Sequence, residues 1–202
     1  MSTESGTRRR ISPEREAQLY GAVLDLLREV GYDALTMDAV AARTHASKAT
    51  LYRQWGGKPR LVVMALTSQR RTRPDEVNTG TLRGDIRALV LAEDEETMAE
   101  RSALMRSLSP AVHHNPELLQ AFRDLLINPS LAELDVLLER AVLRGEVAAG
   151  RPALRFVPHL LVGALVTEEL VGDRLPTHAF LLAYADAVIL PALGVPVPDG
   201  NG

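Results

Sequence analysis

The most constraining feature of this sequence is the stretch from Thr36 to Lys58, which reads TMDAVAARTHASKATLYRQWGGK. Thr36 and Ser47 favour helix N-caps, because each hydroxyl can accept a hydrogen bond from a backbone N–H of the first helical turn. The Gly56-Gly57 pair favours a helix end. The stretch therefore predicts two short helices joined by a tight turn, with a second turn leading into another helix.

The second of these helices, expected over residues 48–55, has two different faces. Leu51 and Trp55 are four residues apart and share an apolar side. The other side carries two cations, a small residue and an aromatic hydroxyl, supplied by Lys48, Ala49, Tyr52 and Arg53. This layout is typical of a helix that packs on a small core and enters a DNA major groove.

An ordered set of residues in and around this stretch carries a resemblance to a known family. The set is Gly31-Tyr32, Thr36, Val40-Ala41, Ala46-Ser47, Thr50-Leu51-Tyr52, Trp55, Lys58 and Leu61. In order and spacing it resembles the DNA-binding domain of TetR/AcrR-family transcriptional regulators, over roughly the first third of the chain.

The sequence departs from the family pattern at three positions. His45 stands where the family usually has glycine, at a turn that often needs a positive φ, which histidine tolerates at some cost. Ala49 replaces a common glycine, and Pro59 follows Lys58. These departures remove no DNA-facing group, and they place the geometry of the turn at His45 in question.

The resemblance implies a set of DNA-binding residues. Lys48 is assigned to a phosphate or a base edge, Tyr52 to a phosphate with Arg53 beside it, and Ala49 and Thr50 to bases. Lys58 is assigned to a phosphate at the start of the next helix, and the helix starts capped by Thr36 and Ser47 can present backbone N–H groups to phosphates. The full predicted set is Thr36, Ser47, Lys48, Ala49, Thr50, Tyr52, Arg53 and Lys58.

Charge and composition agree with a DNA-binding N-terminal domain followed by a domain that does not bind DNA. Residues 1–74 carry 13 Lys and Arg against 7 Asp and Glu, whereas the remainder carries 10 against 19. A basic N-terminal third on an acidic body is expected of such a protein. The chain is 46% hydrophobic and 4% aromatic, a composition rich in Leu, Val and Ala that favours helices.

The pattern of caps and prolines predicts an all-α protein of two domains. Residues 1–11 are expected to be a disordered basic arm with Arg8, Arg9 and Arg10. Residues 12–74 are expected to be a three-helix helix-turn-helix DNA-binding domain with a fourth helix after it, over 58–71. Its first helix should run from Pro13 to Val30 and stop at Gly31. A linker over 75–81 leads to a helical ligand-binding and dimerisation domain over 82–194, and 195–202 are expected to be a disordered tail.

The second domain should consist of helices separated at prolines. One break is expected between Ser109-Pro110 and Asn115-Pro116 and another at Asn128-Pro129, and the last two helices are expected over 152–172 and 176–193. Pro158 should kink the first of these two, because it removes one backbone donor.

The family resemblance implies a small-molecule pocket in the second domain. Met105, Leu108, Phe122, Leu126, Phe156 and Leu160 are the plausible lining, although ordinary helical core is the preferred interpretation of each. Few aromatic and few convergent polar residues favour an apolar ligand.

The resemblance also implies a homodimer that binds a roughly palindromic operator. The expected interface residues are Leu161, Leu165, Phe180, Leu181, Tyr184 and Val188, with intramolecular core as the alternative.

Other chemistry is not indicated by the sequence. There is no phosphate-binding loop, dinucleotide fingerprint or nucleophile elbow, and no cysteine for a disulfide or thiolate metal site. His113-His114 with Glu117 could be drawn as a metal site, but the histidine pair lies between two prolines and is interpreted as a surface break between helices. No cofactor or metal is expected.

The predicted function is therefore a cytoplasmic DNA-binding repressor, not an enzyme, released by a small apolar ligand. No signal peptide or membrane-spanning run is visible, which fits that location. An activator or ligand-independent regulator remains an alternative with the same DNA-binding domain. An all-α enzyme or interaction module is the alternative from another class.

Overall fold

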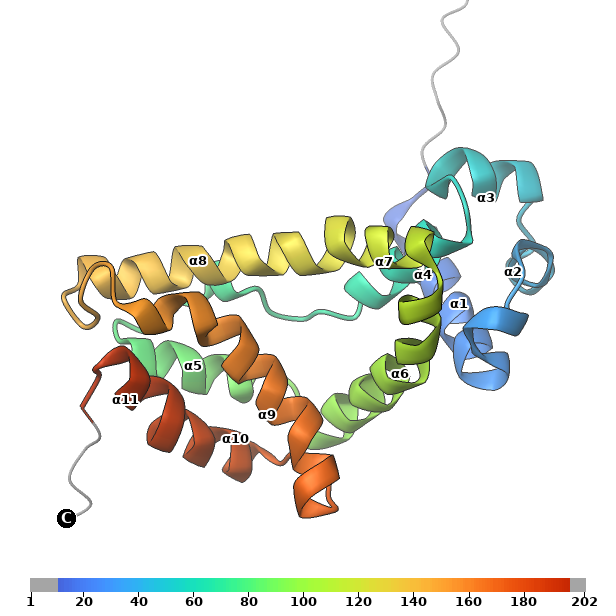
Figure 1. The fold of residues 1–202 in the computed structure, drawn as a ribbon. Helices are drawn as coiled ribbons and strands as arrows, with labels where there is room; N and C mark the ends of the chain where they lie inside the picture. Colours follow the sequence, from blue (N-terminus) through green and yellow to red (C-terminus); the bar gives the residue numbers. More distant parts are fainter. Residues whose placement is uncertain (1–10, 197–202) are drawn as a thin grey trace, which may run out of the picture. The chain divides into compact units, whose positions relative to one another are not determined.

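The computed structural model describes residues 11–196, and within this range the regular structure is helical (Figure 1). The described residues fall into two compact units. The first comprises the residues up to Gln69 together with Ala111–Leu125, and the second comprises Arg70–Pro110 and the residues from Leu126 onward. The predicted all-α fold of two parts is confirmed. The arm with Arg8, Arg9 and Arg10, and most of the tail, lie outside the described residues.

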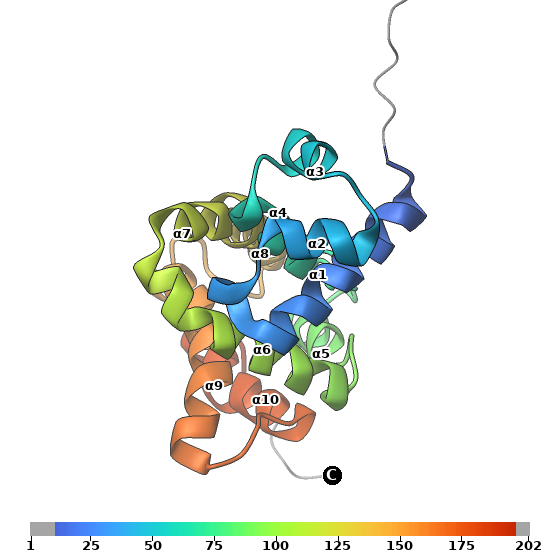
Figure 2. The same ribbon diagram turned by 90° about the vertical axis from the view of Figure 1, so that its right-hand side faces the viewer.

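The first unit is built on α1 (Pro13–Ala34), α2 (Met37–Thr44), α3 (Lys48–Trp55) and α4 (Lys58–Thr67), and α7 (Pro116–Phe122) packs on α4. The axes of α1, α2 and α3 run in different directions, as Figure 2 shows. Leucine and valine side chains of α1 and α4 form the buried centre, with Leu19, Val23, Leu27, Leu61 and Val62 almost completely inaccessible. Burial of such side chains is the main stabilising contribution of the unit.

The first helix begins as expected and ends differently. The Ser12 hydroxyl accepts from the Arg15 backbone N–H at 3.3 Å, and Pro13 occupies the first turn. Gly31 adopts φ 74°, which breaks the helical path at the predicted position. A further helical turn follows, however, so that the element ends at Ala34, and Val30 is exposed rather than part of the apolar face.

The boundary between the units differs from the predicted one at residue 74. Ala111–Leu125 belongs to the first unit, because Leu118, Ala121 and Phe122 are buried in it and α7 packs on α4. Arg70–Pro74 belongs to the second unit, where Arg70 and Arg73 both bind the carboxylate of Glu133. Residues 111–125 thus complete the core of the first unit, which is called the head from here on. Local sequence patterns do not reveal this contribution, because the segment is distant in the sequence from α1–α4.

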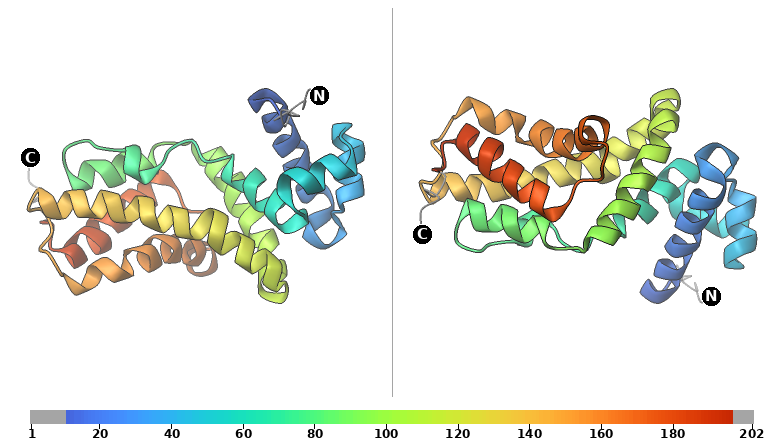
Figure 3. Two further views of the ribbon diagram at one scale, coloured as in Figure 1. Left: turned by 90° about the horizontal axis from the view of Figure 1, so that it is seen from above. Right: turned by 90° about the horizontal axis from the view of Figure 1, so that it is seen from below.

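The second unit contains α5 (Leu82–Val90), α8 (Asn128–Leu143), α9 (Val157–Gly172), α10 (His178–Tyr184) and α11 (Leu190–Leu193). Both views of Figure 3 show α5, α8, α9 and the α10–α11 segment side by side. Their shared core includes Leu82, Leu137, Leu138, Val157 and Ile189. The helix α6 (Glu95–His114) contributes residues to both units.

A buried ionic network ties the start of α5 to the end of α8. Asp85 is completely buried, and its carboxylate accepts from the Thr79 backbone N–H at 2.6 Å and from an Arg144 guanidinium N–H at 3.1 Å. Glu146 accepts from Arg144 at 2.5 Å and from the Leu82 backbone N–H at 2.7 Å. Each charge therefore has hydrogen-bonded partners, as a buried charge requires.

The expected helix breaks are found in part. Pro110 lies inside α6, so the first break does not begin there, but it does come at Asn115-Pro116, where the Asn115 side chain accepts from the Leu118 backbone N–H at 3.0 Å. Asn128-Pro129 does not interrupt the helical path, because a π turn over Arg123–Ile127 leads directly into α8. Proline has no N–H to satisfy, so it fits the first turn of α8.

The expected kink at Pro158 is also wrong. Residues Pro152–Phe156 form a 3-10 turn, and α9 begins at Val157, so Pro158 falls in its first turn. A first-turn N–H has no partner within a helix, and its loss at proline costs nothing. The last expected helix is divided into α10, a π turn over Ala185–Ile189 and α11.

Candidate nucleic-acid interface

The N-caps of α2 and α3 are formed by the two predicted hydroxyl residues. The Thr36 hydroxyl accepts from the Ala39 backbone N–H at 3.1 Å, and the Ser47 hydroxyl accepts from the Thr50 backbone N–H at 3.1 Å. The Ser47 and Thr50 hydroxyl oxygens are also hydrogen-bonded to each other, at 2.8 Å. These bonds fix where each helix begins, and they position the first turn of α3.

The turn between α2 and α3 has the backbone conformation expected at His45. His45 adopts φ 50° and ψ 32°, the left-handed region, and ends α2. The Ala46 backbone N–H donates to the Ala41 carbonyl at 3.1 Å, which closes the turn. A histidine thus occupies a position where glycine would be free of strain, at a cost that the surrounding hydrogen bonds offset.

One face of α3 is anchored in the core of the head. Leu51 and Trp55 are buried, as predicted. The Trp55 ring meets the Tyr20 ring edge-on, with centroids 6.0 Å apart, and its indole N–H donates to the Tyr20 hydroxyl at 3.1 Å. Gly56 then ends the helix with φ 78°. The orientation of α3 is therefore set by its packing on α2 and α4 together with this contact to α1.

The opposite face of α3 is open. Lys48, Ala49, Arg53 and Gln54 are exposed, and Tyr52 keeps 46% of its surface accessible although it is aromatic. Thr50 is half-buried beside Ser47. The structure thus brings five of the predicted DNA-binding residues, 48–50, 52 and 53, onto one helix of eight residues.

Lys48 forms an ion pair across the helix-turn-helix. Its ammonium lies 2.9 Å from a carboxylate oxygen of Asp38 in the first turn of α2. This neighbour raises the pKa of Lys48 through the hydrogen bond and the charge of Asp38. The sequence indicates Asp38 only as a favourable charge at a helix start, because the ten-residue separation gives no local signal of the pairing.

Lys58 does not occupy the position predicted for it. Its ammonium turns inward and donates to the carbonyl oxygens of Tyr32 and Leu35, each at 2.9 Å, and to that of Asp33 at 3.5 Å. It also lies 4.2 Å from the centre of the Tyr32 ring. Burial lowers its pKa. All three N–H donors have acceptors, so Lys58 ties α4 to the end of α1, and we leave it out of the DNA surface.

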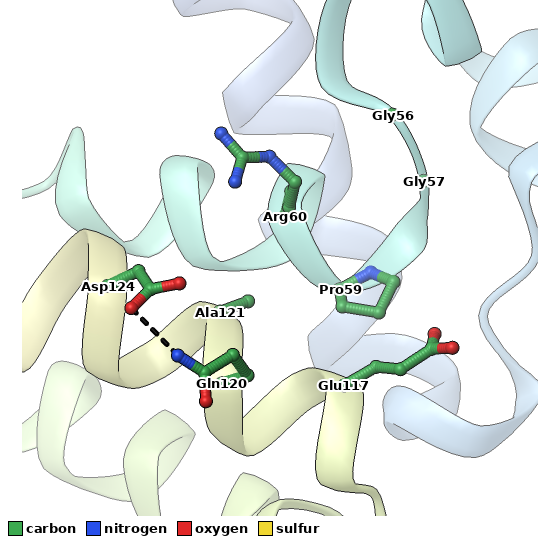
Figure 4. Close-up of a pocket in the computed structure, with 8 residues that line it drawn as sticks. All are labelled: Gly56, Gly57, Pro59, Arg60, Glu117, Gln120, Ala121 and Asp124. Carbon is green, nitrogen blue, oxygen red and sulfur yellow. Dashed lines mark hydrogen bonds between the residues drawn. The ribbon is translucent and has the colours of Figure 1, made fainter.

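A surface pocket of about 310 Å³ lies beside the α3–α4 turn (Figure 4). One wall is the Gly56-Gly57 turn with Pro59 and Arg60, and the other is the face of α7 and the following π turn. In this view the Gln120 amide donates to Asp124 at 2.9 Å, and Glu117 extends along the opposite end of the pocket. The sequence gives no indication of this pocket, because its walls come from distant segments.

The residues predicted to line an effector pocket lie in different surroundings. Leu108 and Phe122 are buried, Phe122 in the first unit, whereas Met105, Leu126 and Leu160 are half-buried in the second. Phe156 is 45% exposed and lies against the Arg155 guanidinium and the His159 ring. Phe122 therefore belongs to the core of the head and is removed from the lining.

The predicted dimer residues are mostly half-buried. Leu161, Leu165, Phe180, Leu181 and Tyr184 are partly accessible, Val188 is exposed, and the Phe180 and Tyr184 rings stack with centroids 6.1 Å apart. More exposed than these are the apolar side chains of α9 at Val162, Val166 and Leu170, which are 60%, 54% and 80% exposed. The spacing of these residues by four positions is visible in the sequence. Spacing alone, however, does not distinguish the face of α9 that packs on the core from the face that is exposed.

The described residues were also compared with the requirements of a membrane span and of a metal site. Within residues 11–196, no helix is both long and apolar enough to cross a bilayer. In the same range, no three His, Cys, Asp or Glu residues are grouped as a metal site would require.

Comparison with known proteins gives matches across both units. Residues 20–64 match the family described as bacterial regulatory proteins, tetR family, and residues 76–188 match the tetracyclin repressor-like C-terminal domain. An uncharacterized HTH-type transcriptional regulator of Mycobacterium tuberculosis is 36% identical over 179 residues, covering 89% of this chain and 88% of that protein.

A DNA-binding transcriptional repressor of Mycobacteroides abscessus, named TetR, is 37% identical over 177 residues, covering 87% of this chain and 92% of the relative. Among solved structures, that of the TetR family transcription regulator SCO0332 aligns with a TM-score of 0.64 at 24% identity. The alignment covers 89% of this chain and 98% of that one, and it supports the fold.

Proposed function

Because the chain belongs to the TetR family of transcriptional regulators and carries the DNA-binding helix-turn-helix domain of that family, we propose that it is a homodimeric repressor released from a palindromic operator by a small apolar ligand. Its relatives are named as regulators, so it is a DNA-binding protein and not an enzyme. Repression rests on the relative from Mycobacteroides abscessus that is named a repressor. A protein that acts on chromosomal DNA works in the cytoplasm, and we place this one there.

The single observation that carries the DNA-binding role is the open face of α3. Lys48, Tyr52 and Arg53 offer hydrogen-bond donors there, and Ala49 and Thr50 offer small groups that can approach base edges. Tyr52 and Arg53 are assigned to phosphates, which position the helix without reading sequence. Thr36 and Ser47 hold the helix starts, whose remaining backbone N–H groups can also face phosphates.

Dimerisation is supported by the apolar surface of α9 and α10. Val162, Val166 and Leu170 form a continuous exposed stripe on α9, and the predicted residues of α9 and α10 are only half-buried. Contiguous exposed apolar surface of this kind marks an interaction site. A two-fold dimer presents two copies of α3, so its operator should contain two inverted half-sites.

The effector role concerns the second unit, which matches the tetracyclin repressor-like C-terminal domain. We place the ligand among the half-buried apolar residues Met105, Leu126 and Leu160. DNA and ligand would favour different arrangements of the dimer, so each would weaken binding of the other reciprocally. A lipophilic compound library screened by thermal stabilisation tests this part, because a ligand of the native state raises the melting temperature. If no compound stabilises the protein, the result counts against release by an apolar ligand and favours regulation by DNA binding alone.

The deciding experiment is selection of random duplex DNA by the purified protein, with sequencing after several rounds. The control is the variant Lys48→Ala/Tyr52→Ala, whose changes lie on the exposed face of α3 and leave its buried face intact. A palindromic site enriched only by the unchanged protein supports the proposal. Absence of enrichment at low salt, also after unfolding, ligand removal and refolding, would contradict it. A reporter gene behind the enriched site then shows whether the protein represses or activates.

A further inference from the structure

An acidic side chain lies on the surface that should meet DNA. Asp38, in the first turn of α2, is 71% exposed, and its carboxylate pairs with the ammonium of Lys48, which is 51% exposed. Lys48 is the first residue of α3, and its open face is the candidate DNA surface. A carboxylate within 2.9 Å of a group at that surface is therefore close to any phosphate that Lys48 approaches.

The helix itself does not account for this carboxylate. The hydroxyl of Thr36 already caps α2, and an acidic residue in the first turn contributes only about 0.3–1 kcal/mol through the helix dipole. A negative charge that faces a polyanion opposes binding. The main expected effect of the Asp38 carboxylate is therefore to lower the affinity for DNA.

We propose that Asp38 tunes the affinity for DNA by cancelling the charge of Lys48 at the recognition surface. The paired groups present no net charge to the phosphates, so they add nothing to sequence-independent attraction. Lys48 keeps two further N–H donors for a phosphate or a base edge, because the pair uses one of three. This inference rests on the proposed DNA-binding role of α3.

Counterion release determines how large the effect on DNA affinity should be. Each phosphate that a protein cation neutralises changes the slope of log affinity against log salt concentration by about −0.9. In Asp38→Asn the charge of Lys48 is no longer cancelled, so the slope should become steeper by about 0.9. The variant should bind about eightfold more tightly than the unchanged protein at 0.1 M salt, and the difference should vanish near 1 M.

The experiment measures binding of a fluorescent random-sequence duplex by anisotropy across a series of salt concentrations. Asp38→Asn should steepen the slope, and Asp38→Glu should keep it, since the charge is retained. Lys48→Met should make the slope shallower, because Asp38 is then unpaired. Asp38→Asn/Lys48→Met should return to the slope of the unchanged protein, since the net charge is again zero.

A matched control is available in the same unit. Glu29 and Arg43 form an exposed pair at 2.7 Å that joins α1 to α2, and both partners lie outside α3. Glu29→Gln should shift the slope by clearly less than Asp38→Asn. An equal shift would mean that only the total charge of the head matters, and it would overturn a specific role for Asp38.

Two further outcomes would overturn the proposed role of Asp38, and a third would contradict the proposed function. If Asp38→Asn leaves the slope unchanged while the protein still binds DNA, the inference is wrong and the proposed function stands. If Asp38→Asn enriches a different site in the random-duplex selection, Asp38 reads bases rather than tuning affinity, which also overturns it. Failure of the unchanged protein to bind any duplex would instead contradict the proposed function.

Discussion

The indole N–H of Trp55 donates a hydrogen bond to the hydroxyl of Tyr20, 3.1 Å away, and this bond joins the recognition helix to the first helix of the head. Tyr20 in turn donates to a carboxylate oxygen of Glu16 at 2.9 Å. Both rings are buried. The open face of α3 is therefore held in place by a polar contact inside the core as well as by apolar packing.

Replacement of Tyr20 by phenylalanine should destabilise the head. The ring would remain, but the Trp55 N–H would be buried without an acceptor, which costs about 1–3 kcal/mol. Urea unfolding followed by tryptophan fluorescence measures the change, because Trp55 is the single tryptophan of the chain. Tyr52→Phe, at an exposed position, is the control and should change stability by less than about 0.5 kcal/mol. Equal stability of the two variants would contradict a structural role for the bond.

Replacement of Tyr32 by phenylalanine should have the opposite effect on stability. Its hydroxyl is buried and has no hydrogen-bond partner among the described residues, so Tyr32→Phe removes an unsatisfied polar group and should be neutral or stabilising. The ring under the Lys58 ammonium is kept in this variant. A loss of more than about 1 kcal/mol in urea unfolding would show that the hydroxyl has a partner.

Tyr20 and Tyr32 should both lose their hydroxyl protons only at high pH. Burial is the main cause that raises the pKa of Tyr20 and that of Tyr32, each to about 12 from an ordinary value of 10.0. The folded state holds these protons more tightly than the unfolded state, so their contribution to stability is complete below pH 10 and is lost between about pH 10 and 12. Absorbance at 295 nm measures tyrosinate formation. Each Tyr→Phe variant should lose one ionisation near pH 12, and loss of one near pH 10 instead would contradict the assignment.

On α3, substitutions at Tyr52 and Thr50 should affect DNA binding differently. Tyr52→Ala should weaken binding to all operators similarly, because a phosphate contact carries no sequence information. Thr50→Ala should change base preference at one position of each half-site, because its side chain is assigned to a base. Parallel selections from one random duplex pool compare the variants. Unchanged preference in Thr50→Ala would remove Thr50 from base readout.

In the second unit, Arg144→Met should cost about 3 kcal/mol of stability. The variant leaves the fully buried Asp85 carboxylate without its guanidinium, and an uncompensated buried charge is strongly destabilising. Chemical denaturation followed by circular dichroism measures the loss. Arg106→Met is the control, since Arg106 pairs with Glu169 at the surface and such pairs contribute less than about 1 kcal/mol. A loss in Arg144→Met as small as in the control would show that the network is dispensable.

The apolar stripe of α9 leads to a test of dimerisation. Val166→Arg places a charge in the middle of the stripe and should convert the proposed dimer to monomers, with weaker operator binding as a consequence. Analytical ultracentrifugation measures the mass in solution. Leu143→Arg, at a position on α8 that is 86% exposed, is the control and should remain dimeric. A dimer that survives Val166→Arg but not Leu143→Arg would move the interface from α9 to α8.

The helix-turn-helix could be predicted closely from the sequence because its signals are local. The hydroxyls of Thr36 and Ser47 cap helices that begin at the next residue, His45 adopts the left-handed backbone that the turn requires, and Leu51 and Trp55 face inward. Caps, turns and helical periodicity depend on residues within about four positions, so a short stretch is sufficient to define them.

The prolines at positions 13 and 116 lie at helix starts, as predicted, but three other predictions based on prolines failed. Pro110, Pro129 and Pro158 were all expected to break or kink helices, yet each is accommodated within a helix or its first turn. For Pro129 and Pro158 the reason is their position in a first turn, because a proline is disruptive only where a backbone N–H would otherwise be bonded within the helix, and that position depends on where the helix begins. That start is set by packing as much as by local residues.

By itself, the sequence determined the helical class, the caps and turn of the DNA-binding motif and the division of α3 into a buried and an open face. Only the tertiary structure decided that Lys58 turns inward, that Asp38 pairs with Lys48, and that residues 111–125 complete the head. These features join groups ten or more positions apart in the chain. Such groups meet only when the whole unit has folded, because burial and charge pairing depend on neighbours in space rather than along the chain.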